Sequence, residues 1–341
     1  MDKLWRVSSS PHILDRDSVP KIMRAVVLAL LPALGGALYF FGIRALWVTL
    51  VAVVTAVVTE YLIEKLLNKP VTIKDWSAVV TGMLLAYNLP PEVPLWIPII
   101  GSVFAIAIVK QAFGGLGFNP VNPALAARAL LLASWPIHVT VFNTPPRGGT
   151  LSGIDIITSA TPLNVMKQSL QVLKNVDAYS IDKVNKASEA IIQLHASYGN
   201  LFWGKVGGCI GETSAFLLLL GAAFLLYRHI IGWHIPLSYI ATVAVLTWIF
   251  GGSNGLFSGD PTFHVLAGGL ILGAFFMATD MVTSPLTPKA CIWFGIGCGV
   301  ITTVIRLIGG YPEGVSYSIL LMNLVTPLLN RLRPKAFGER K

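Results

Sequence analysis

The sequence predicts an all-α polytopic membrane protein of about ten transmembrane helices, arranged as two inverted five-helix repeats with broken helices. Of its 341 residues, 54% are apolar and 12% are charged, whereas soluble domains carry about 25% charged residues. Charge-free runs of 17–19 residues recur at Ala25–Ile43, Val93–Val109, Pro261–Thr279 and Gly314–Asn330. A helix of about this length crosses a hydrocarbon core about 30 Å thick. These observations exclude a soluble enzyme, a disordered chain and a disulfide scaffold.

We expect ten spans, and the charge-free runs overlap the first, fourth, eighth and tenth of them. The spans are 22–42, 45–64, 76–90, 94–113, 122–141, 213–229, 233–251, 263–280, 289–307 and 315–331. Proline, glycine and polar residues interrupt the apolar pattern at 88–91, 117–123 and 279–285. Lipid cannot satisfy the backbone groups that such breaks leave free, so they would face protein or a cavity. The alternative is that they are ordinary loops between spans.

The distribution of Lys and Arg predicts the orientation of the chain. With a cytoplasmic N-terminus, the inner segments hold sixteen of the 25 basic residues, and the short outer loops hold Arg44 and Arg306. Cytoplasmic loops carry the excess of basic residues, so we expect both termini to be cytoplasmic and residues 142–212 to be extracytoplasmic. The net charge of +9 is then explained by inner-face basic residues beside anionic lipid, and not by nucleic acid. We see no cleaved signal peptide.

This topology divides the chain into five parts. Residues 1–21 form a cytoplasmic tail, 22–141 the first transmembrane repeat, 142–212 an outer segment, 213–331 the second repeat and 332–341 a second cytoplasmic tail.

Two stretches support the internal repeat. Lys110–Gly115 aligns with Arg306–Gly310, and a similar apolar span follows each glycine pair. Five spans in each half force the two copies into opposite orientations. Inverted repeats with interrupted helices are typical of transporters, whose functional site lies near the repeat interface.

The outer segment contains two amphipathic helical patterns, at about 163–174 and 182–196. The strip from Asp155 to Leu163 precedes the first, and its Thr161-Pro162 pair reads on physical grounds as a helix N-cap. The strip Gly204–Ser214 is rich in glycine and leads into the sixth span. Such a strip can present backbone N–H groups to an anion, but it lacks the spacing of a P-loop or a dinucleotide fingerprint.

Together these strips resemble a known family, which comprises the D subunit of the Rnf ion-translocating oxidoreductase and the B subunit of the sodium-pumping NADH:quinone reductase. The resemblance rests on Thr158-Ser159-Ala160-Thr161-Pro162, on Gly207-Gly208-Cys209-Ile210-Gly211-Glu212-Thr213-Ser214, on Ser9-Ser10-Pro11-His12 and on Ser18–Arg24. It runs nearly end to end. The short N-terminal tail favours the Rnf branch, and the quinone-reductase protein is the alternative.

The resemblance implies a covalent FMN, joined through its phosphate to the hydroxyl of Thr161. Asp155, Thr158, Ser159, Ala160 and Pro162 would complete the flavin-binding motif, in which Ser159 replaces the usual glycine. A second, non-covalent flavin such as riboflavin is left open. The chain would serve a complex that oxidises ferredoxin, reduces NAD and exports Na⁺ or H⁺. Its partners would be the A, B, C, E and G proteins of the Rnf complex in a bacterial or archaeal plasma membrane, and the chain would not be catalytically complete alone.

Ionisable residues within spans are costly and usually functional or paired. We select Asp280 and Glu212 as ion-path candidates, because each lies at a helix break beside glycine or hydroxyl-bearing residues. The alternative is a structural ion pair, for example one that Arg128 makes with an acid across the repeat interface. The six histidines and three cysteines show no ligand spacing, so we expect no metal site.

Two other classes of protein remain open at this point. A channel or secondary transporter for a small solute would also have inverted repeats, and a purely structural membrane protein is a third reading. The outer Thr-Ser-Ala-Thr-Pro segment favours the flavoprotein, because a channel has no need of it.

Overall fold

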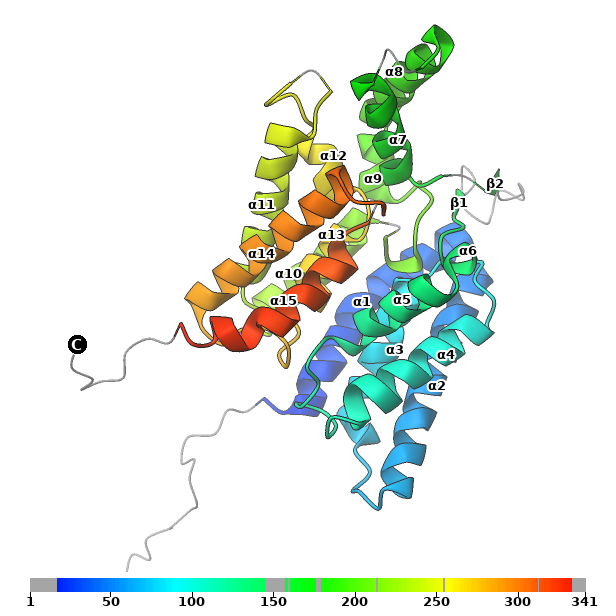
Figure 1. The fold of residues 1–341 in the computed structure, drawn as a ribbon. Coiled ribbons are helices and arrows are strands. Elements are labelled where there is room, and N and C mark those ends of the chain that lie inside the picture. The colour runs from blue at the N-terminus through cyan, green and yellow to red at the C-terminus, as the bar shows by residue number, and fades with distance from the viewer. Residues whose placement is uncertain are drawn as a thin grey trace, which may run out of the picture.

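The computed structural model describes residues 17–144, 157–158, 160–175, 179–212, 214–253, 255–311 and 313–332. Two groups of helices lie side by side, and a helical lobe stands above them (Figure 1). The first group comprises α1 (Val19–Phe41), α2 (Ile43–Leu66), η1 (Ile73–Asp75), α3 (Ser77–Tyr87), α4 (Trp96–Phe104), the π-helix η2 (Ala105–Gln111), α5 (Pro123–Ser134) and α6 (Pro136–Val139).

The lobe and the second group follow in the chain. The lobe comprises α7 (Pro162–Lys174), α8 (Ile181–Ala196) and α9 (Tyr198–Trp203), and the short η5 (Ile210–Glu212) leads back into the bundle. The second group comprises α10 (Ala215–Tyr227), α11 (His234–Phe250), α12 (Pro261–Leu266), α13 (Leu270–Leu272), the π-helix η6 (Gly273–Met277), α14 (Pro288–Leu307) and α15 (Val315–Leu329).

Each of the ten predicted ranges contains a helix, and the two amphipathic patterns of the outer segment coincide with α7 and α8. In the described part of the chain, α1, α2 and α14 are long and apolar enough to cross a membrane. The other apolar helices are shorter. α3 ends and α5 begins at two of the predicted interruptions, 88–91 and 117–123, whereas the break between α12 and α13, at 267–269, lies outside the predicted ones. One small departure from the all-α prediction is an antiparallel strand pair, β1 (Asn143–Thr144) with β2 (Ile157–Thr158), in which Asn143 lies opposite Thr158.

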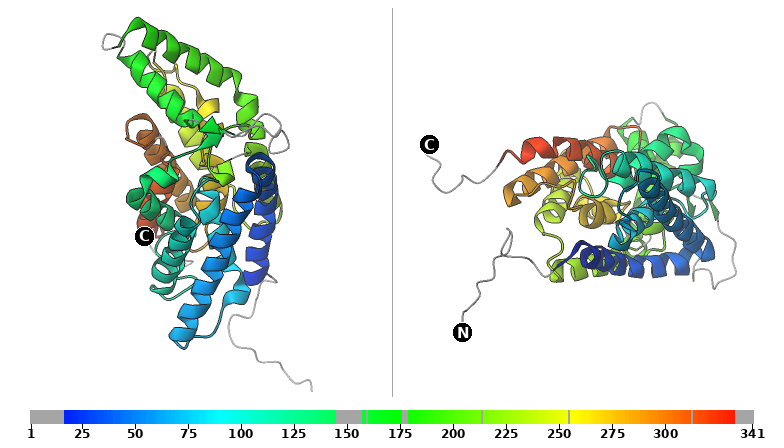
Figure 2. Two further views of the ribbon diagram at one scale, coloured as in Figure 1. Left: turned by 90° about the vertical axis from the view of Figure 1, so that its right-hand side faces the viewer. Right: turned by 90° about the horizontal axis from the view of Figure 1, so that it is seen from below.

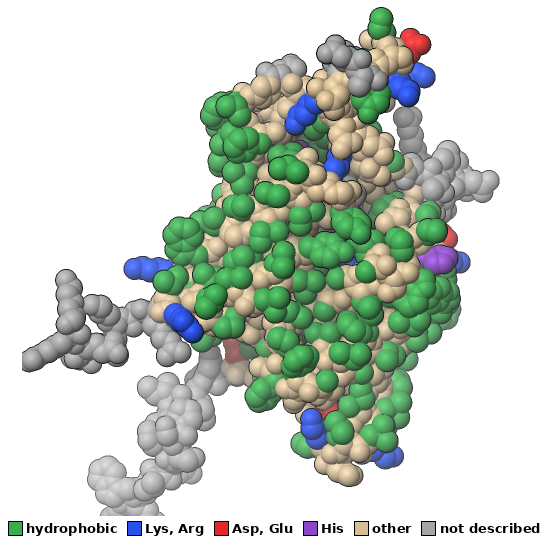
Figure 3. Space-filling model, in the orientation of Figure 1, with side chains coloured by type: hydrophobic (Ala, Val, Ile, Leu, Met, Phe, Trp, Pro, Cys, Tyr) green, Lys and Arg blue, Asp and Glu red, His purple; other side chains and the backbone are tan. Residues whose placement is uncertain are grey.

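Many of the apolar residues lie on the surface and not in the core. Leu28, Trp47 and Val54 on α1 and α2 are each more than half exposed, and hydrophobic side chains cover the band between the lobe and the opposite end (Figure 3). Soluble monomers rarely expose such a wide apolar area. The surface is therefore that of a protein whose helices face lipid.

The two groups of helices contact each other through corresponding elements. α1, the first helix of the first group, packs on α10, the first of the second. α5, which begins the fifth predicted span, packs on α15, the helix of the tenth (Figure 2). A Cβ atom added at Gly221 would lie 2.0 Å from the backbone oxygen of Ala29, and one added at Gly36 would lie 2.4 Å from Leu217. Between these two contacts the residue number rises along α1 and falls along α10, so the two helices are antiparallel.

The α5–α15 contact has the same sense. With its amide turned to the orientation that satisfies both side-chain atoms, Asn323 accepts a hydrogen bond from the backbone N–H of Asn122 (3.1 Å). Arg128 pairs with Glu313, just before α15 begins. The residue number again rises along one helix and falls along the other, so α5 and α15 are also antiparallel.

The lobe has a small core of its own and is fixed to the second group at its base. Leu163, Met166 and Leu201 bury their side chains against Phe263 and Ala267 of the α12 region. The hydroxyl of Tyr198 donates a hydrogen bond to Asp260, and His195 Nε2 lies 3.4 Å from the same carboxylate. Burial and this hydrogen bond raise the pKa of Tyr198. α7 is thereby held over one end of the bundle (Figure 2).

Candidate functional site

Thr161 is the N-cap residue of α7. Its backbone is extended (φ −62°, ψ 152°), its Oγ1 accepts a hydrogen bond from the N–H of Asn164 (3.3 Å), and Pro162 occupies the first turn. The predicted cap is therefore confirmed. The side chain is 6% exposed, and the free N–H groups of the first helical turn give this end of the helix a partial positive charge.

A pocket lies beside Thr161, between the lobe and the bundle. Gly207 and Gly268 contribute no side chain to its walls, and Glu212 and Glu313 contribute their carboxylates. Two residues that the sequence predicted for different roles, Thr161 and Glu212, are thus brought to one place.

Arg128 holds the acids of this pocket. Its Nη1 donates to Asn88 Oδ1 (2.5 Å) and lies 4.0 Å from Glu212 Oε1, while its Nη2 forms an ion pair with Glu313. The Arg128 side chain is 8% exposed and that of Glu313 is 16% exposed. The predicted alternative for Arg128, an ion pair with an acid across the two halves, is confirmed. The partner itself was missed, although Glu313 is a lone acid in a short break between two apolar stretches.

Three of these groups could in principle hold a metal ion. One ligand atom each from Cys209, Glu212 and Glu313 lies within 4.8 Å of the others. However, the Arg128 guanidinium already supplies the positive charge that the two carboxylates require, and the Cys209 thiol donates to the backbone oxygen of Asn88 (3.4 Å). The donor set is therefore better suited to an ion pair than to a metal.

Asp280 lies in a different pocket, at the far end of the bundle from Thr161. It lies three residues after Met277, the end of η6. Its Oδ2 accepts a hydrogen bond from the hydroxyl of Thr283 (3.1 Å), and its Oδ1 accepts a long one from the N–H of Val282 (3.4 Å). Among the ion pairs of the described residues, none includes Asp280. Its carboxylate therefore differs from those of Glu212 and Glu313, which lie beside an arginine.

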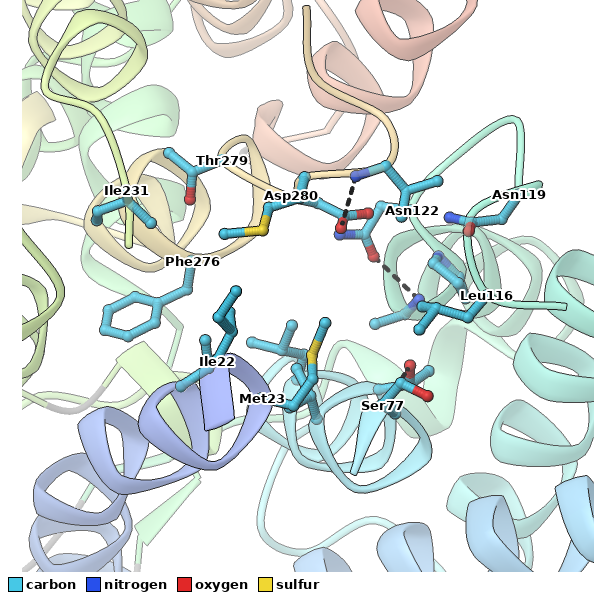
Figure 4. Close-up of a pocket in the computed structure, with 18 of the residues that line it drawn as sticks. Ile22, Met23, Ser77, Leu116, Asn119, Asn122, Ile231, Phe276, Thr279 and Asp280 are labelled. Atoms are coloured by element: carbon cyan, nitrogen blue, oxygen red, sulfur yellow. Dashed lines mark hydrogen bonds between the residues drawn. The ribbon is translucent and has the colours of Figure 1, made fainter. Parts of the chain in front are cut away.

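The Asp280 pocket is formed by both halves of the chain (Figure 4). Asn119 and Asn122 come from the first group, together with Met23 of α1, and Phe276 comes from η6. Asn122 caps α5 through Oδ1, which accepts from the N–H of Ala124 (3.1 Å), and its Nδ2 donates to the backbone oxygen of Met277 (3.3 Å). This side chain connects the start of α5 to the end of η6, immediately beside Asp280.

Glu60 and Lys110, two further charges within predicted spans, form a pair of their own. Lys110 Nζ lies 2.5 Å from Glu60 Oε1, and the side chains are 2% and 0% exposed. Lys110 also donates to Ser77 Oγ (2.5 Å), and Gln111 Nε2 donates to Glu60 Oε1 (3.1 Å). We interpret this pair as a structural one.

The other motif residues lie on either side of Thr161 in the chain. Asp155 and Ser159 lie outside the described residues, and Thr158 belongs to β2. Ala160 is exposed immediately before the cap, and Pro162 is half-buried.

Comparison with known proteins agrees with the motifs. Residues 6–338 match the NQR2, RnfD, RnfE family. The chain is 49% identical, over 99% of its length and 97% of the relative's, to the D subunit of the proton-translocating ferredoxin:NAD(+) oxidoreductase complex of Clostridium ljungdahlii. It is also 49% identical, over 98% and 96%, to the D subunit of the Na(+)-translocating ferredoxin:NAD(+) oxidoreductase complex of Acetobacterium woodii. The D subunit of the ion-translocating oxidoreductase complex of Stutzerimonas stutzeri is 39% identical over 95% and 93%.

Proposed function

Because this chain belongs to the NQR2, RnfD, RnfE family, we propose that it is the D subunit of an Rnf-type membrane complex. In that complex it carries electrons between ferredoxin and NAD, and the transfer is coupled to export of Na⁺ or H⁺. The proposal includes both cations, because one of two relatives that are equally similar to this chain is named proton-translocating and the other Na(+)-translocating. The A, B, C, E and G proteins of the complex supply the ferredoxin and NAD sites.

We assign a covalent FMN to Thr161, and the position of this residue carries the assignment. Its hydroxyl lies at the N-terminus of a 13-residue helix, where a phosphoester would meet unpaired N–H groups and the positive end of the helix dipole. A small pocket, whose walls include Gly207 and Gly268, adjoins the attachment point. When bound, a flavin accepts and passes on one or two electrons. Thr161 would hold it, and Arg128 would keep the two neighbouring carboxylates neutralised.

Asp280 is our principal candidate for ion coupling. A carboxylate with no cationic partner among the described ion pairs, at a helix break between the two halves, can exchange a proton or bind a small cation. Glu212 is the second candidate. Its Oε1 has no hydrogen-bond partner, but Arg128 lies 4.0 Å away, and so we place it after Asp280.

We place a second, non-covalent flavin such as riboflavin in the Asp280 pocket. Apolar side chains, among them Met23 and Phe276, supply walls for a planar ring, and the amides of Asn119 and Asn122 supply donors and acceptors at its edge. The test is acid precipitation of the protein, which releases non-covalent flavin into the supernatant. We expect chromatography to identify the released flavin as riboflavin.

We propose ten spans with both termini in the cytoplasm, the lobe outside, and two inverted repeats that meet at α1–α10 and α5–α15. The antiparallel packing of corresponding helices supports this, because a two-fold axis in the membrane plane relates helices in that way. The start of α1 and the end of α15 also lie away from the lobe (Figure 1). The five parts are the tail 1–21, repeats 22–141 and 213–331, the outer segment 142–212 and the tail 332–341, in a bacterial or archaeal plasma membrane.

The test of the flavin assignment is fluorescence of the denatured chain in a gel, since a covalent flavin survives SDS. We expect the wild-type chain to fluoresce and Thr161→Ala to insert but remain dark, with intact mass lower by one FMN-phosphoryl group. The host must supply a flavin transferase. Thr158→Ala is the matched control and should keep its fluorescence. A fluorescent Thr161→Ala chain would refute the assignment.

A further inference from the structure

A groove with a basic lining runs between α7, α12 and α14, on the side of Leu163 away from the Thr161 pocket. Lys167 and Lys174 of α7 line it from the lobe, and His264 and Arg306 line it from the bundle. Among the described residues that line it, none is acidic. The polar side chain of Gln171 and the apolar ones of Leu163, Met166, Leu170 and Leu307 complete the walls.

Arg306 has unused donors at the buried end of this groove. Its side chain is 3% exposed, Nη1 donates to the backbone oxygen of His264, and Nη2 donates to that of Ala267 (3.1 Å). Its Nε has no partner, and none of the ion pairs of the described chain includes it. A buried guanidinium whose Nη atoms meet only carbonyl oxygens and whose Nε meets nothing is costly unless an anion completes its shell.

His264 provides a second unsatisfied group in the same wall. It is 4% exposed, and its Nδ1 has no hydrogen-bond partner. Two residues that line the groove, Arg306 and His264, thus each carry a buried nitrogen without a hydrogen-bond partner.

The two lysines contribute differently. Lys167 Nζ donates to the backbone oxygens of Ile305, Gly309 and Tyr311, and so it caps the end of α14 and contributes charge without a spare donor. Lys174 is exposed at the mouth of the groove. Two cationic groups held by hydrogen bonds, Lys167 and Arg306, and the exposed Lys174 therefore line a space that the chain does not fill with a carboxylate.

We propose that this groove binds a phosphate group, either from the headgroup of a membrane lipid or from free phosphate. Guanidinium and ammonium groups together are typical of phosphate sites. The groove lies at the last residues of α14, a helix of membrane-spanning length, and so it lies at the level of lipid headgroups. Its apolar walls suit the glycerol and upper acyl carbons of a lipid.

The site is separate from the flavin attachment proposed above. The Thr161→Ala chain has no phosphoester, and we expect it to retain the phosphate ligand. Loss of fluorescence and loss of the ligand are therefore distinguishable results.

The experiment uses the full-length chain in phosphatidylcholine nanodiscs that contain a minority of phosphatidylglycerol, and native mass spectrometry counts the lipids that remain bound. We expect one phosphatidylglycerol per chain. Lys174→Gln should lower its occupancy about fivefold, the effect of one basic residue near an anionic headgroup, and Arg306→Gln should lower it further. Lys186→Gln, at an exposed position of α8, removes the same charge outside the groove and should change nothing.

A second arm titrates inorganic phosphate against chloride at equal ionic strength and follows the thermal midpoint of the detergent-solubilised chain. If phosphatidylglycerol stays bound in the nanodisc experiment, the source of the phosphate group is a lipid headgroup. If only inorganic phosphate stabilises the chain, and Lys174→Gln abolishes that effect, the source is free phosphate. Equal retention of the two lipids, with no phosphate effect that depends on Lys174, would overturn the proposal. Because Lys174 is exposed, its variant tests the site even if Arg306→Gln fails to fold.

Discussion

Arg128 carries its charge in a nearly dry part of the molecule, and groups from three parts of the chain hold it. Asn88 accepts from one side of the guanidinium, Glu313 pairs with the other, and Glu212 lies within 4.0 Å. Removal of one member of such a set leaves the others buried without compensation, which costs far more than the net contribution of the intact set.

Replacement of Arg128 by Met should therefore destabilise the chain by about 3–5 kcal/mol. Denaturation in detergent would show this as a lower midpoint, because Glu313 and Glu212 lose their shared cation. The double variant Arg128→Met with Glu313→Gln should recover part of the loss, since it removes the unpaired acid as well. Equal stability of the single and double variants would show that the pair is not coupled.

Replacement of Asp280 by Asn should lower the number of cations moved per electron in the reconstituted complex, while in-gel flavin fluorescence stays normal. The amide keeps the shape of the carboxyl group and removes the charge that a desolvated cation needs. Glu92→Gln is a suitable control, because Glu92 pairs with Arg44 at the surface. Unchanged transport would make Asp280 a structural residue, and Asp280→Glu tests the site if the complex fails to assemble.

At the scale of elements, the contact of α1 with α10 depends on small side chains. Ala29, Ala33, Gly36 and Ala37 are buried along one face of α1, and Gly221 of α10 lies against the backbone of Ala29. Small residues let two membrane helices approach closely, so that packing and not the hydrophobic effect holds them together.

Gly221→Ala should therefore destabilise the chain by about 1–3 kcal/mol, because the new Cβ would lie 2.0 Å from the Ala29 oxygen. Gly35→Ala is the matched control: it makes the same change in α1, where an added Cβ meets nothing within 4 Å. Thermal unfolding of both variants in one detergent measures the difference. An equal midpoint for both would contradict the close approach of α1 to α10.

The helices were predictable from the sequence, and the partners in the contacts between them were not. The apolar runs placed a helix in each predicted range, and Thr161-Pro162 marked the start of α7, because both signals are local. Glu313 lies 185 positions from Arg128, and nothing in one sequence indicates that the two meet. The π-helices η2 and η6 were missed as well, since a π-helix shifts the backbone hydrogen bonds by one residue and leaves composition unchanged.

At the scale of the whole molecule, the proposed orientation puts the lobe outside the cell. In a chain from which Cys209, Cys291 and Cys298 have been removed, Ser180→Cys at the start of α8 should react with an impermeant maleimide in intact cells. Lys69→Cys, between α2 and η1, should react only after lysis. Both positions are exposed, so their accessibility differs by membrane side alone. The reverse pattern would invert the topology.

During synthesis, Arg128 is made well before Glu313, its ion-pair partner in the other half of the chain. Glu313 follows Arg128 by 185 residues, which a ribosome adds in about 10–40 s at 5–20 residues per second. During that interval Arg128 is in the growing chain without its carboxylate. Asn88 is made 40 residues before Arg128, so its side-chain oxygen is present from the start to accept from the guanidinium. The same amide that completes the finished site can thus hold the charge while the second half is still being made.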